Sequence, residues 1–187
     1  MRLFVALDFP ESIRGTIREL VVCLKPLADQ ARWTRVEGMH VTLKFIGHVE
    51  QEQCERIVAA LASIHLHDPV DLRFRGVGFF PSGRRPRVFW CGIEASPNLA
   101  ELVAEIERAL LPLGIPAEKR EFVPHLTLAR FDSPRGLGKL VEKSEEVKFL
   151  DLGATRQGQF HLLKSVLKRS GAEYTKLNSF AFAEEPA

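Results

Sequence analysis

A short strand-like motif occurs twice in the chain, and this repetition constrains the fold more than any other feature of the sequence. Residues 39–45 (MHVTLKF) align with residues 124–130 (PHLTLAR) at an offset of 85, so each half of the chain contains His-x-Thr-Leu. The strand-like segments 4–8 and 90–94 match at an offset of 86. Two matches at nearly one offset predict an internal duplication, with two related halves in one fold.

Side chains alternate along a strand, so each motif gives its strand one polar face and one apolar face. His40 and Thr42 project from the same side, and the apolar residues next to them enter the core on the other side. His125 and Thr127 repeat this arrangement. If an approximate two-fold axis relates the halves, the four polar side chains converge on one cleft, with the two imidazoles facing each other.

Hydrophobic periodicity predicts strands and helices in an order that begins again near the middle of the chain. The expected strands are residues 2–9, 39–46, 70–79, 87–93, 122–130, 147–152, 159–167 and 174–182. The expected helices are residues 10–24, 51–64 and 97–110, the last with Ser96 as its N-cap, and a weakly helical stretch at 135–145. No stretch resembles an interdomain linker, so we expect residues 1–187 to form a single domain of two intertwined halves.

Composition restricts the class of protein. The chain has 187 residues and a net charge of +2, which is too small to indicate indiscriminate binding to nucleic acid or to an anionic membrane. No apolar run approaches the roughly 18 residues that span a bilayer, and Asp8 comes too early for a signal-peptide core, so we expect a cytoplasmic protein. Cys23, Cys54 and Cys91 lack CxxC spacing and are expected to be reduced structural thiols, the first two on apolar helix faces.

Two opposed histidines suit hydrolysis or transfer at phosphorus. In-line displacement needs a base for the attacking oxygen and, on the other side of phosphorus, an acid for the leaving oxygen. Threonine hydroxyls beside the histidines can donate hydrogen bonds to the non-bridging oxygens. This scheme requires no metal and no other cofactor.

Three other interpretations of the motifs compete with this one. A metal site is disfavoured, because two histidines with no third ligand in either motif make a poor coordination shell. A threonine nucleophile is disfavoured, because its hydroxyl lies beside the histidine instead of pointing at it. An RNA-binding module would use the histidines only to hold phosphate, and an intact His-x-Thr in both halves argues against it.

Further segments extend the pattern beyond the two motifs: residues 2–6 (RLFVA), 79–81 (FFP), 86–90 (PRVFW), 124–130 and 165–174. With these segments the chain resembles the 2H phosphoesterases, specifically the RNA 2′,3′-cyclic phosphodiesterase family, which is also called the 2′-5′ RNA ligase family. The resemblance spans nearly the whole chain. It implies an α+β fold of two lobes, with two antiparallel sheets flanked by helices and an active cleft between them.

The resemblance assigns the catalytic roles to His40 and His125 and the phosphate-holding roles to Thr42 and Thr127. It implies that His40 protonates the leaving 3′ oxygen and that His125 activates water, which leaves a 2′-phosphate. The sequence itself leaves open which histidine is the acid and which is the base.

The fifth residue after each histidine has a further role by resemblance: Phe45 would be a platform for the terminal base, and Arg130 would contact the phosphate. Strict strand alternation puts both side chains on the face opposite the histidines, so these roles require a bulge or a turn at the strand end. Otherwise Phe45 is a core residue. His48 stands where the family more often has an acid, and we expect it in a surface turn.

Other basic and aromatic residues have two interpretations each. Arg84, Arg85 and Arg87 either form a solvated hairpin tip or guide the RNA backbone near the cleft. Trp33 either stacks on a base or packs onto its own lobe. No role is expected for three unmatched histidines, His65, His67 and His161.

The leading hypothesis is a metal-independent hydrolase that opens a 2′,3′-cyclic phosphate at an RNA end. The alternative within the same fold is a 2′-5′ RNA ligase, or a phosphodiesterase for other cyclic or 2′-5′-linked nucleotides. The expected partner is RNA with a 2′,3′-cyclic phosphate terminus, or a cyclic nucleotide, bound by a monomer with no membrane involved. The sequence leaves the physiological RNA open.

Overall fold

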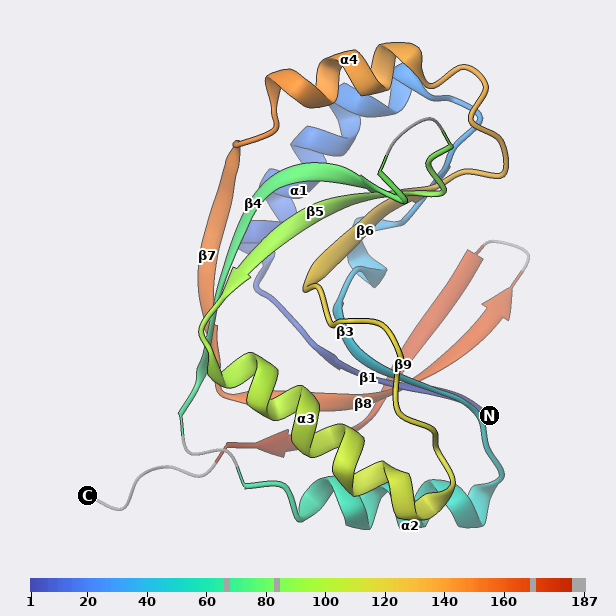
Figure 1. Cartoon of the computed structure of the whole chain (residues 1–187), viewed down its shortest axis with the longest axis vertical. Helices are drawn as coiled ribbons and strands as arrows, with labels where there is room; N and C mark the ends of the chain where they lie inside the picture. Colours follow the sequence, from blue (N-terminus) through green and yellow to red (C-terminus); the bar gives the residue numbers. More distant parts are fainter. Residues whose placement is uncertain (66–67, 83–84, 169–170, 183–187) are drawn as a thin grey trace.

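The chain folds into two antiparallel sheets (Figure 1), and one His-x-Thr motif lies at the start of a strand in each sheet. The computed structural model describes residues 1–65, 68–82, 85–168 and 171–182. Sheet A has the strand order β3 (Val41–His48), β1 (Arg2–Leu7), β8 (Gln159–Lys168) and β9 (Gly171–Ala181). Sheet B has the order β2 (Arg32–Trp33), β6 (His125–Arg130), β5 (Val88–Ala95), β4 (Val70–Phe80) and β7 (Asp151–Gln157). This α+β architecture agrees with the prediction.

Helices cover the two sheets from different sides. The helices are α1 (Glu11–Leu24), α2 (Gln51–Ala62), α3 (Asn98–Leu110) and α4 (Gly138–Glu146), with 3-10 turns η1 (Lys25–Leu27), η2 (Val36–Gly38) and η3 (Leu111–Leu113). Helix α1 packs beside β7 of sheet B, whereas α2 and α3 pack together along sheet A (Figure 1). None of the described helices is long and apolar enough to cross a membrane.

Helix α1 forms where apolar residues recur at helical spacing. Its buried positions are those that the periodicity predicts, namely Ile13, Ile17, Leu20, Val21 and Leu24. Cys23 is exposed, so the prediction that it lies on the apolar face is wrong, because the helical rotation turns position 23 away from that face. Cys54 and Cys91 are buried, and burial raises the pKa of Cys91 to about 12, which makes it an unreactive thiol.

The strand β7 begins later than the hydrophobic pattern predicts, at residue 151 instead of 147. Residues 147–150 form a turn after α4, and the Leu150 carbonyl accepts a hydrogen bond from the Gly76 N–H at 2.8 Å. Gly76 has a positive φ of 69°, and a Cβ there would collide with the Lys148 carbonyl. This turn therefore docks against β4 at a position that only glycine allows.

Helix α3 begins at Asn98, with Pro97 and not Ser96 at its N-cap position. The Ser96 hydroxyl instead accepts a hydrogen bond from the backbone N–H of Asp71 at 2.9 Å. The predicted cap is therefore wrong, because the serine side chain joins α3 to the start of β4.

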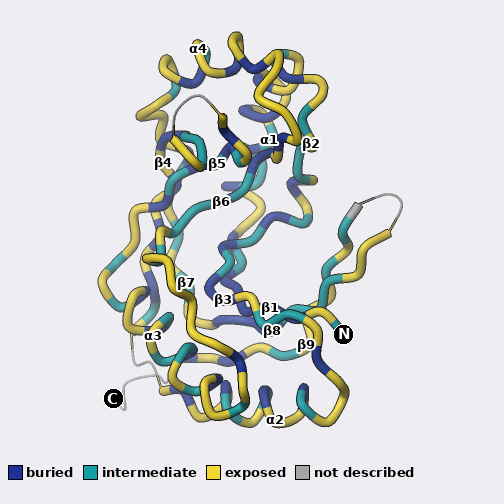
Figure 2. The backbone as a smooth tube through the Cα atoms, turned by 45° about the vertical axis from the view of Figure 1, so that its right-hand side comes forward, coloured by how far each residue is buried: buried dark blue, intermediate teal, exposed yellow. Residues whose placement is uncertain are grey.

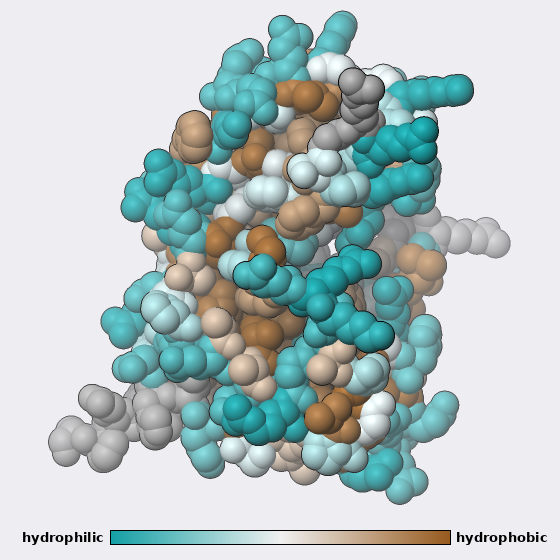
Figure 3. All heavy atoms as spheres, viewed as in Figure 1, coloured by the Kyte–Doolittle hydropathy of each residue, from teal (hydrophilic) through white to brown (hydrophobic). Residues whose placement is uncertain are grey.

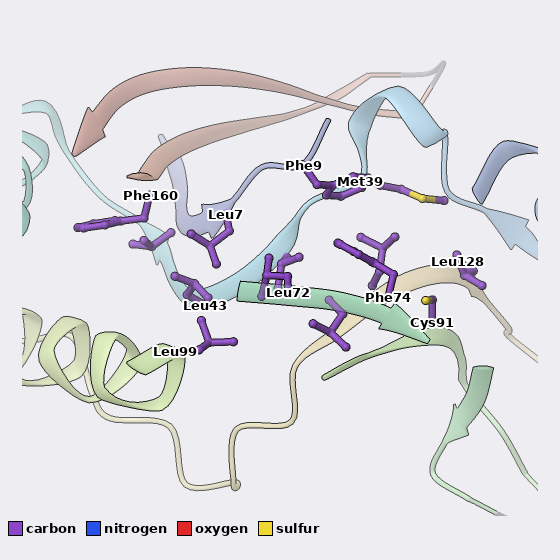
Figure 4. Packing of buried hydrophobic residues seen from close by; sticks show 14 of the residues in the cluster. Leu7, Phe9, Met39, Leu43, Leu72, Phe74, Cys91, Leu99, Leu128 and Phe160 are labelled. Atoms are coloured by element: carbon purple, nitrogen blue, oxygen red, sulfur yellow. The ribbon is translucent and has the colours of Figure 1, made fainter. Parts of the chain in front are cut away.

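Buried side chains from both sheets form one continuous core (Figure 4). Leu7 and Leu43 come from sheet A, Phe74 and Leu128 come from sheet B, and Leu99 comes from α3. Figure 2 shows the buried positions concentrated in the strands and the exposed positions on the outer sides of α2 and α4. Figure 3 shows hydrophilic side chains over much of the face in view, with hydrophobic residues gathered near its middle. Because one core joins the sheets, it fixes the position of β3 relative to β6.

Candidate active site

The two histidines occupy equivalent positions at the start of two strands that touch. His40 immediately precedes β3, His125 is the first residue of β6, and β3 contacts β6 (Figure 1). The Nδ1 atom of His40 lies 2.9 Å from the carbonyl oxygen of Gly38, and Nδ1 of His125 lies 2.8 Å from that of Val123. In each half, the carbonyl belongs to the residue two positions before the histidine.

These hydrogen bonds fix the tautomer of both rings. A carbonyl oxygen only accepts hydrogen bonds, so Nδ1 of His40 and of His125 carries a proton. The other nitrogen, Nε2, accepts a proton when the ring is neutral and donates one when the ring is charged. Each histidine can therefore act as an acid or as a base through the same atom.

A β-bulge in β3 returns Phe45 to the face that carries His40 and Thr42, which we call the histidine face of sheet A. Thr42 and Lys44 pair with consecutive residues of β1, so Leu43 is the extra residue. Leu43 and Lys44 are both buried, whereas 56% of the Phe45 surface is exposed. The bulge shifts the alternation by one position, as a site role for Phe45 requires. The core interpretation of Phe45 is wrong.

The same bulge occurs in β6, again directly after the threonine. Thr127 and Ala129 pair with consecutive residues of β5, so Leu128 is the extra residue. Leu128 and Ala129 are buried, and Arg130 is exposed on the side of His125 and Thr127, the histidine face of sheet B. The two halves therefore share the motif and also the β-bulge, which places the fifth residue after each histidine, Phe45 or Arg130, on the histidine face.

Strand pairing corrects one part of the predicted duplication. The positions of the two bulges agree with the offset of 85 for the motif strands. In the strands beside them, Ala6 lies opposite Thr42 and Trp90 lies opposite Thr127, so Ala6 and Trp90 are equivalent at an offset of 84. The predicted offset of 86 is wrong by two residues. A two-residue shift keeps every side chain on the same face of the strand, so the alternation of polar and apolar residues does not distinguish the two alignments.

Aromatic rings enclose His40 on the histidine face of sheet A. The Phe4 ring lies 4.5 Å from the imidazole, and the Tyr174 ring meets it edge-on at 4.8 Å. Tyr174 also packs on Gly38, where a Cβ would lie 3.2 Å from the tyrosine ring. A side chain at position 38 would therefore push Tyr174 away from the residue whose carbonyl orients His40.

The environment of His40 favours its neutral form. A hollow of about 160 Å³ lies beside it, and its lining includes Asp8, Arg14, His161 and Lys176. Burial lowers the pKa of His40 from 6.5 to about 4. The hydrogen bond to the backbone carbonyl and the Asp8 carboxylate oppose this shift, while the positive charge of Arg14 adds to it. At pH 7 the ring therefore carries no charge.

His125 has its own aromatic neighbours, which lie on the histidine face of sheet B. The Phe80 ring meets the imidazole edge-on at 5.1 Å, and Trp90 packs on Phe80 at 5.0 Å. The indole lies so close to Gly78 that a Cβ there would collide with it. The buried Nε1 of Trp90 has no hydrogen-bond partner within the described part of the chain.

Sequence reasoning gave no role to the four aromatic residues around the histidines, Phe4, Phe80, Trp90 and Tyr174. The available signal was glycine, since a glycine within or beside a strand marks a close approach of another group. Gly38 accommodates Tyr174, and Gly78 accommodates Trp90.

Of the other described candidates, Trp33 and His48 lie away from the two motif histidines, whereas His161 lines the hollow beside His40. Trp33 packs edge-on against Phe89, and its indole donates to the Ala28 carbonyl at 3.0 Å, so Trp33 packs onto its own lobe and is not a base platform. His161 is buried, with Nδ1 2.9 Å from the Ser179 hydroxyl. His48 is exposed at the end of β3.

The arginine cluster and the histidine pair 65 and 67 are described only in part. Arg85 and His65 are exposed, and Arg87 donates a hydrogen bond to the Asp132 carbonyl. Arg84 and His67 lie outside the described residues. Within the described ranges, no three His, Cys, Asp or Glu side chains are grouped so that they could hold a metal ion.

The chain is similar to known proteins in sequence and in fold. A family model of the 2′-5′ RNA ligase superfamily matches residues 9–165. The RNA 2′,3′-cyclic phosphodiesterase of Methanothermobacter thermautotrophicus is 31% identical over 181 residues, which cover 96% of this chain and 98% of that protein. The crystal structure of TT0787 of Thermus thermophilus covers 100% of both chains, with a TM-score of 0.82 and 28% identity.

A third related protein has been crystallised with a nucleotide. The structure of E. coli LigT complexed with 3′-AMP covers 98% of both chains, with a TM-score of 0.78 and 26% identity. The paired motifs, their matched bulges and these similarities lead to one conclusion. The chain belongs to the 2′-5′ RNA ligase superfamily.

Proposed function

We propose that this protein hydrolyses 2′,3′-cyclic phosphate ends of RNA to 2′-phosphate ends, with His40 and His125 as the acid and base. The observation that carries the proposal is the pair of equivalent hydrogen bonds from Nδ1 to a backbone carbonyl, which leaves Nε2 of both rings for proton transfer. The relative from Methanothermobacter is named for this activity, and LigT was crystallised with 3′-AMP.

The proposed reaction is one in-line displacement at phosphorus. The oxygen of a water molecule attacks phosphorus, and the bond between phosphorus and the 3′ oxygen breaks. One imidazole accepts a proton from the water, and the other donates a proton to the 3′ oxygen. The phosphate stays on the 2′ oxygen, and the two rings end the reaction with their protonation states exchanged.

Four further side chains would hold the substrate in this scheme. The hydroxyls of Thr42 and Thr127 are partly exposed on the two histidine faces and would donate hydrogen bonds to the non-bridging oxygens. Arg130 would add a charge-assisted contact to the phosphate, and the exposed ring of Phe45 would stack on the terminal base.

Two arguments give His40 opposite roles, one as the acid and the other as the base. The family resemblance makes His40 the acid. Its lowered pKa instead favours the neutral ring, which is the form that a base needs. If His40 is the acid, the negative charge of the bound phosphate must restore its proton, because an anion next to an imidazole raises its pKa.

The first experiment measures turnover of a short RNA ending in a 2′,3′-cyclic phosphate, with EDTA present. We expect the wild type to yield a 2′-phosphate, and His40→Ala and His125→Ala each to lose about 10² to 10⁴-fold in kcat. His48→Ala is the matched control, because this exposed histidine lies on β3 away from the motif. A wild type that binds the RNA without cleaving it would refute the hydrolase and support a binding module.

A sulfur leaving group separates the acid from the base. A substrate with sulfur in place of the bridging 3′ oxygen needs little help from an acid, because a thiolate leaves without a proton. The variant that lacks the acid should therefore recover much of its activity on this substrate, whereas the variant that lacks the base should not. Recovery by neither variant would contradict this division of roles.

The same groups would catalyse a related displacement in which the 5′ hydroxyl of a second RNA replaces water: its oxygen bonds to phosphorus, its proton passes to the base, and the bond to the 3′ oxygen breaks as before. Joining two RNA ends through a 2′-5′ bond is therefore the second candidate, and the family description names that activity. Because both histidines belong to one chain, we also propose that the protein acts as a monomer. Light scattering at working concentrations tests this.

A further inference from the structure

Two arginines face each other across the edge of sheet B. Strand β2 forms that edge beside β6 (Figure 2), and Arg32 is the direct partner of Arg130 in this antiparallel pair. Side chains of directly paired residues lie on the same face of a sheet. Trp33, the next residue, packs against Phe89 in the core, so Arg32 must point to the opposite side. Arg32 therefore lies on the histidine face of sheet B.

This arrangement costs stability unless an anion is bound. Like charges directly opposite each other destabilise a strand pair. One carboxylate offsets the repulsion in part, since Arg32 Nη2 lies 2.8 Å from Asp132 Oδ1, but both side chains are largely exposed and such pairs contribute little. Arg130 takes part in none of the ion pairs found among the described residues.

Among the residues that the structure describes, the surroundings add positive charge and no further carboxylate ion pair. Arg87 donates to the Asp132 backbone carbonyl, which brings a third guanidinium to the same corner. Of the three arginines, Arg32 contacts the Asp132 carboxylate, Arg87 contacts the Asp132 backbone, and Arg130 forms no ion pair within the described ranges. A planar guanidinium fork matches the oxygens of a phosphate better than a point charge does.

The position of the pair relative to the histidine indicates which phosphate it binds. Arg130 lies three residues beyond Thr127 on β6, which is about 10 Å along a strand. Arg32 lies on β2, so it is one strand farther from β5 than Arg130 is, which is about 5 Å across the sheet. If the reactive cyclic phosphate lies between the threonines and Arg130, Arg32 lies one strand beyond Arg130, toward the edge of the sheet, and is placed for the next phosphate of the chain.

We infer that Arg32 binds the phosphodiester on the 5′ side of the terminal nucleotide, so that the protein prefers an RNA chain to a cyclic mononucleotide. The inference rests on the proposed hydrolysis of 2′,3′-cyclic phosphate ends. It assigns the terminal phosphate to Thr42, Thr127 and Arg130, and the preceding one to Arg32.

The test compares two substrates in wild type and three variants. The substrates are 2′,3′-cyclic AMP, which has no second phosphate, and a trinucleotide that ends in a 2′,3′-cyclic phosphate. Arg32→Gln should raise KM for the trinucleotide about tenfold, leave kcat unchanged and leave both constants for 2′,3′-cyclic AMP unchanged. The slope of log KM against log salt concentration should fall by about 0.7 for the trinucleotide.

Two variants serve as controls. Arg32→Lys keeps the charge, so it should keep the salt dependence of the wild type. Its KM for the trinucleotide should lie between those of the wild type and Arg32→Gln. Arg108→Gln on α3 removes an arginine that is 69% exposed and paired with a glutamate, close to the 66% exposure and carboxylate pairing of Arg32. Arg108→Gln should change neither substrate's constants.

The outcomes separate this inference from the proposed function. An equal effect of Arg32→Gln on both substrates, or no effect on either, overturns the role of Arg32 while hydrolysis stands. Turnover of neither substrate by the wild type overturns the proposed function and this inference together. A binding role also predicts that Arg32→Gln unfolds at the same temperature as wild type or higher, because the repulsion with Arg130 is removed, whereas a merely structural role predicts a lower temperature.

Discussion

His40 makes the stability of the protein depend on pH. The unfolded chain binds a proton at this ring near pH 6.5, whereas the folded protein binds it only near pH 4. Between these values the unfolded state holds more protons, so the free energy of unfolding falls as the pH drops from 6.5 towards 4. The loss from His40 alone should be about 2 to 3 kcal/mol at pH 4.5 relative to pH 7.

Urea unfolding at pH 7 and pH 4.5 checks this prediction. His40→Gln should lose less stability than wild type over that interval, and the exposed His48→Gln should match wild type. His161 contributes in the same direction, since burial also lowers its pKa, so His40→Gln retains some dependence on pH. Identical pH dependence in wild type and His40→Gln would contradict the account of His40.

Phe45 and Phe4 should respond differently to the same substitution, although their ring centroids are only 6.0 Å apart. Phe45 is 56% exposed, so Phe45→Ala should change the free energy of unfolding by less than about 0.5 kcal/mol. It should raise KM for a cyclic-phosphate RNA about tenfold or more if the ring stacks on a base. Phe4 is fully buried, so Phe4→Ala should cost about 3 to 5 kcal/mol. An unchanged KM in Phe45→Ala would refute the platform role.

At the scale of residues, the sequence predicts the paired histidines and threonines because repetition of a polar pattern on a strand is visible in the letters. The placement of Phe45 and Arg130 is not predictable in this way. Each depends on one extra residue, Leu43 or Leu128, that strand pairing leaves unmatched. A bulge is a property of two strands together, and the hydrophobic pattern of one strand does not contain it.

At the scale of elements, a buried ion pair joins β3 to the segment that leads into β6. Lys44, the residue after the bulge in β3, is 5% exposed and donates to Glu107 of α3 at 2.6 and 2.7 Å. It also donates to the Pro116 carbonyl at 2.7 Å, and Glu107 accepts from the backbone N–H of Glu118 at 3.2 Å. The strand that carries His40 is thereby tied to the approach to His125.

Breaking this pair from one side should be costly. Lys44→Met leaves a largely buried carboxylate without its cation, and we expect a loss of about 3 to 5 kcal/mol in urea unfolding. The double variant Lys44→Met/Glu107→Met removes both charges and should recover a large part of that loss. A double variant as unstable as the sum of the two single ones would show that the charges do not interact.

The helices were predictable as elements because their apolar residues recur at the spacing of an α-helix, about every 3.6 residues, which differs from the alternation of a strand. The start of β7 and the cap of α3 were not, because long-range contacts decide them. Leu150 belongs to a turn that docks on Gly76, and Ser96 is used by the backbone of Asp71. A short apolar run or a capping residue looks the same in the sequence whether or not a distant residue contacts it in the fold.

At the scale of the whole molecule, we propose that residues 1–187 unfold as one unit, because the core is continuous between the two sheets. The two tryptophans, Trp33 and Trp90, both lie in sheet B, so their fluorescence reports on that sheet. Far-UV circular dichroism reports on both sheets and the helices. The two signals should give the same midpoint in urea, and a fluorescence midpoint that differs from the dichroism midpoint would contradict the single unit.

The two short matches predict two related halves, and the family resemblance implies two antiparallel sheets, but neither predicts the strand orders β3-β1-β8-β9 and β2-β6-β5-β4-β7. The C-terminal strands complete the pattern in opposite halves, since β7 joins sheet B while β8 and β9 join sheet A. Hydrophobic period identifies strands but carries no information about which edge they join.

The contact between Tyr174 and His40 has a spectroscopic consequence. Tyr174 is the one tyrosine in the chain, and its ring lies 4.8 Å from the imidazole of His40 and 5.5 Å from the ring of Phe4. A sample enriched in carbon-13 at tyrosine would therefore show a single aromatic spin system, whose chemical shift depends on the ring currents of those two neighbours. The protein carries a native reporter at one of its two histidines, and a nucleotide entering the site would move one resonance without any dye or substitution.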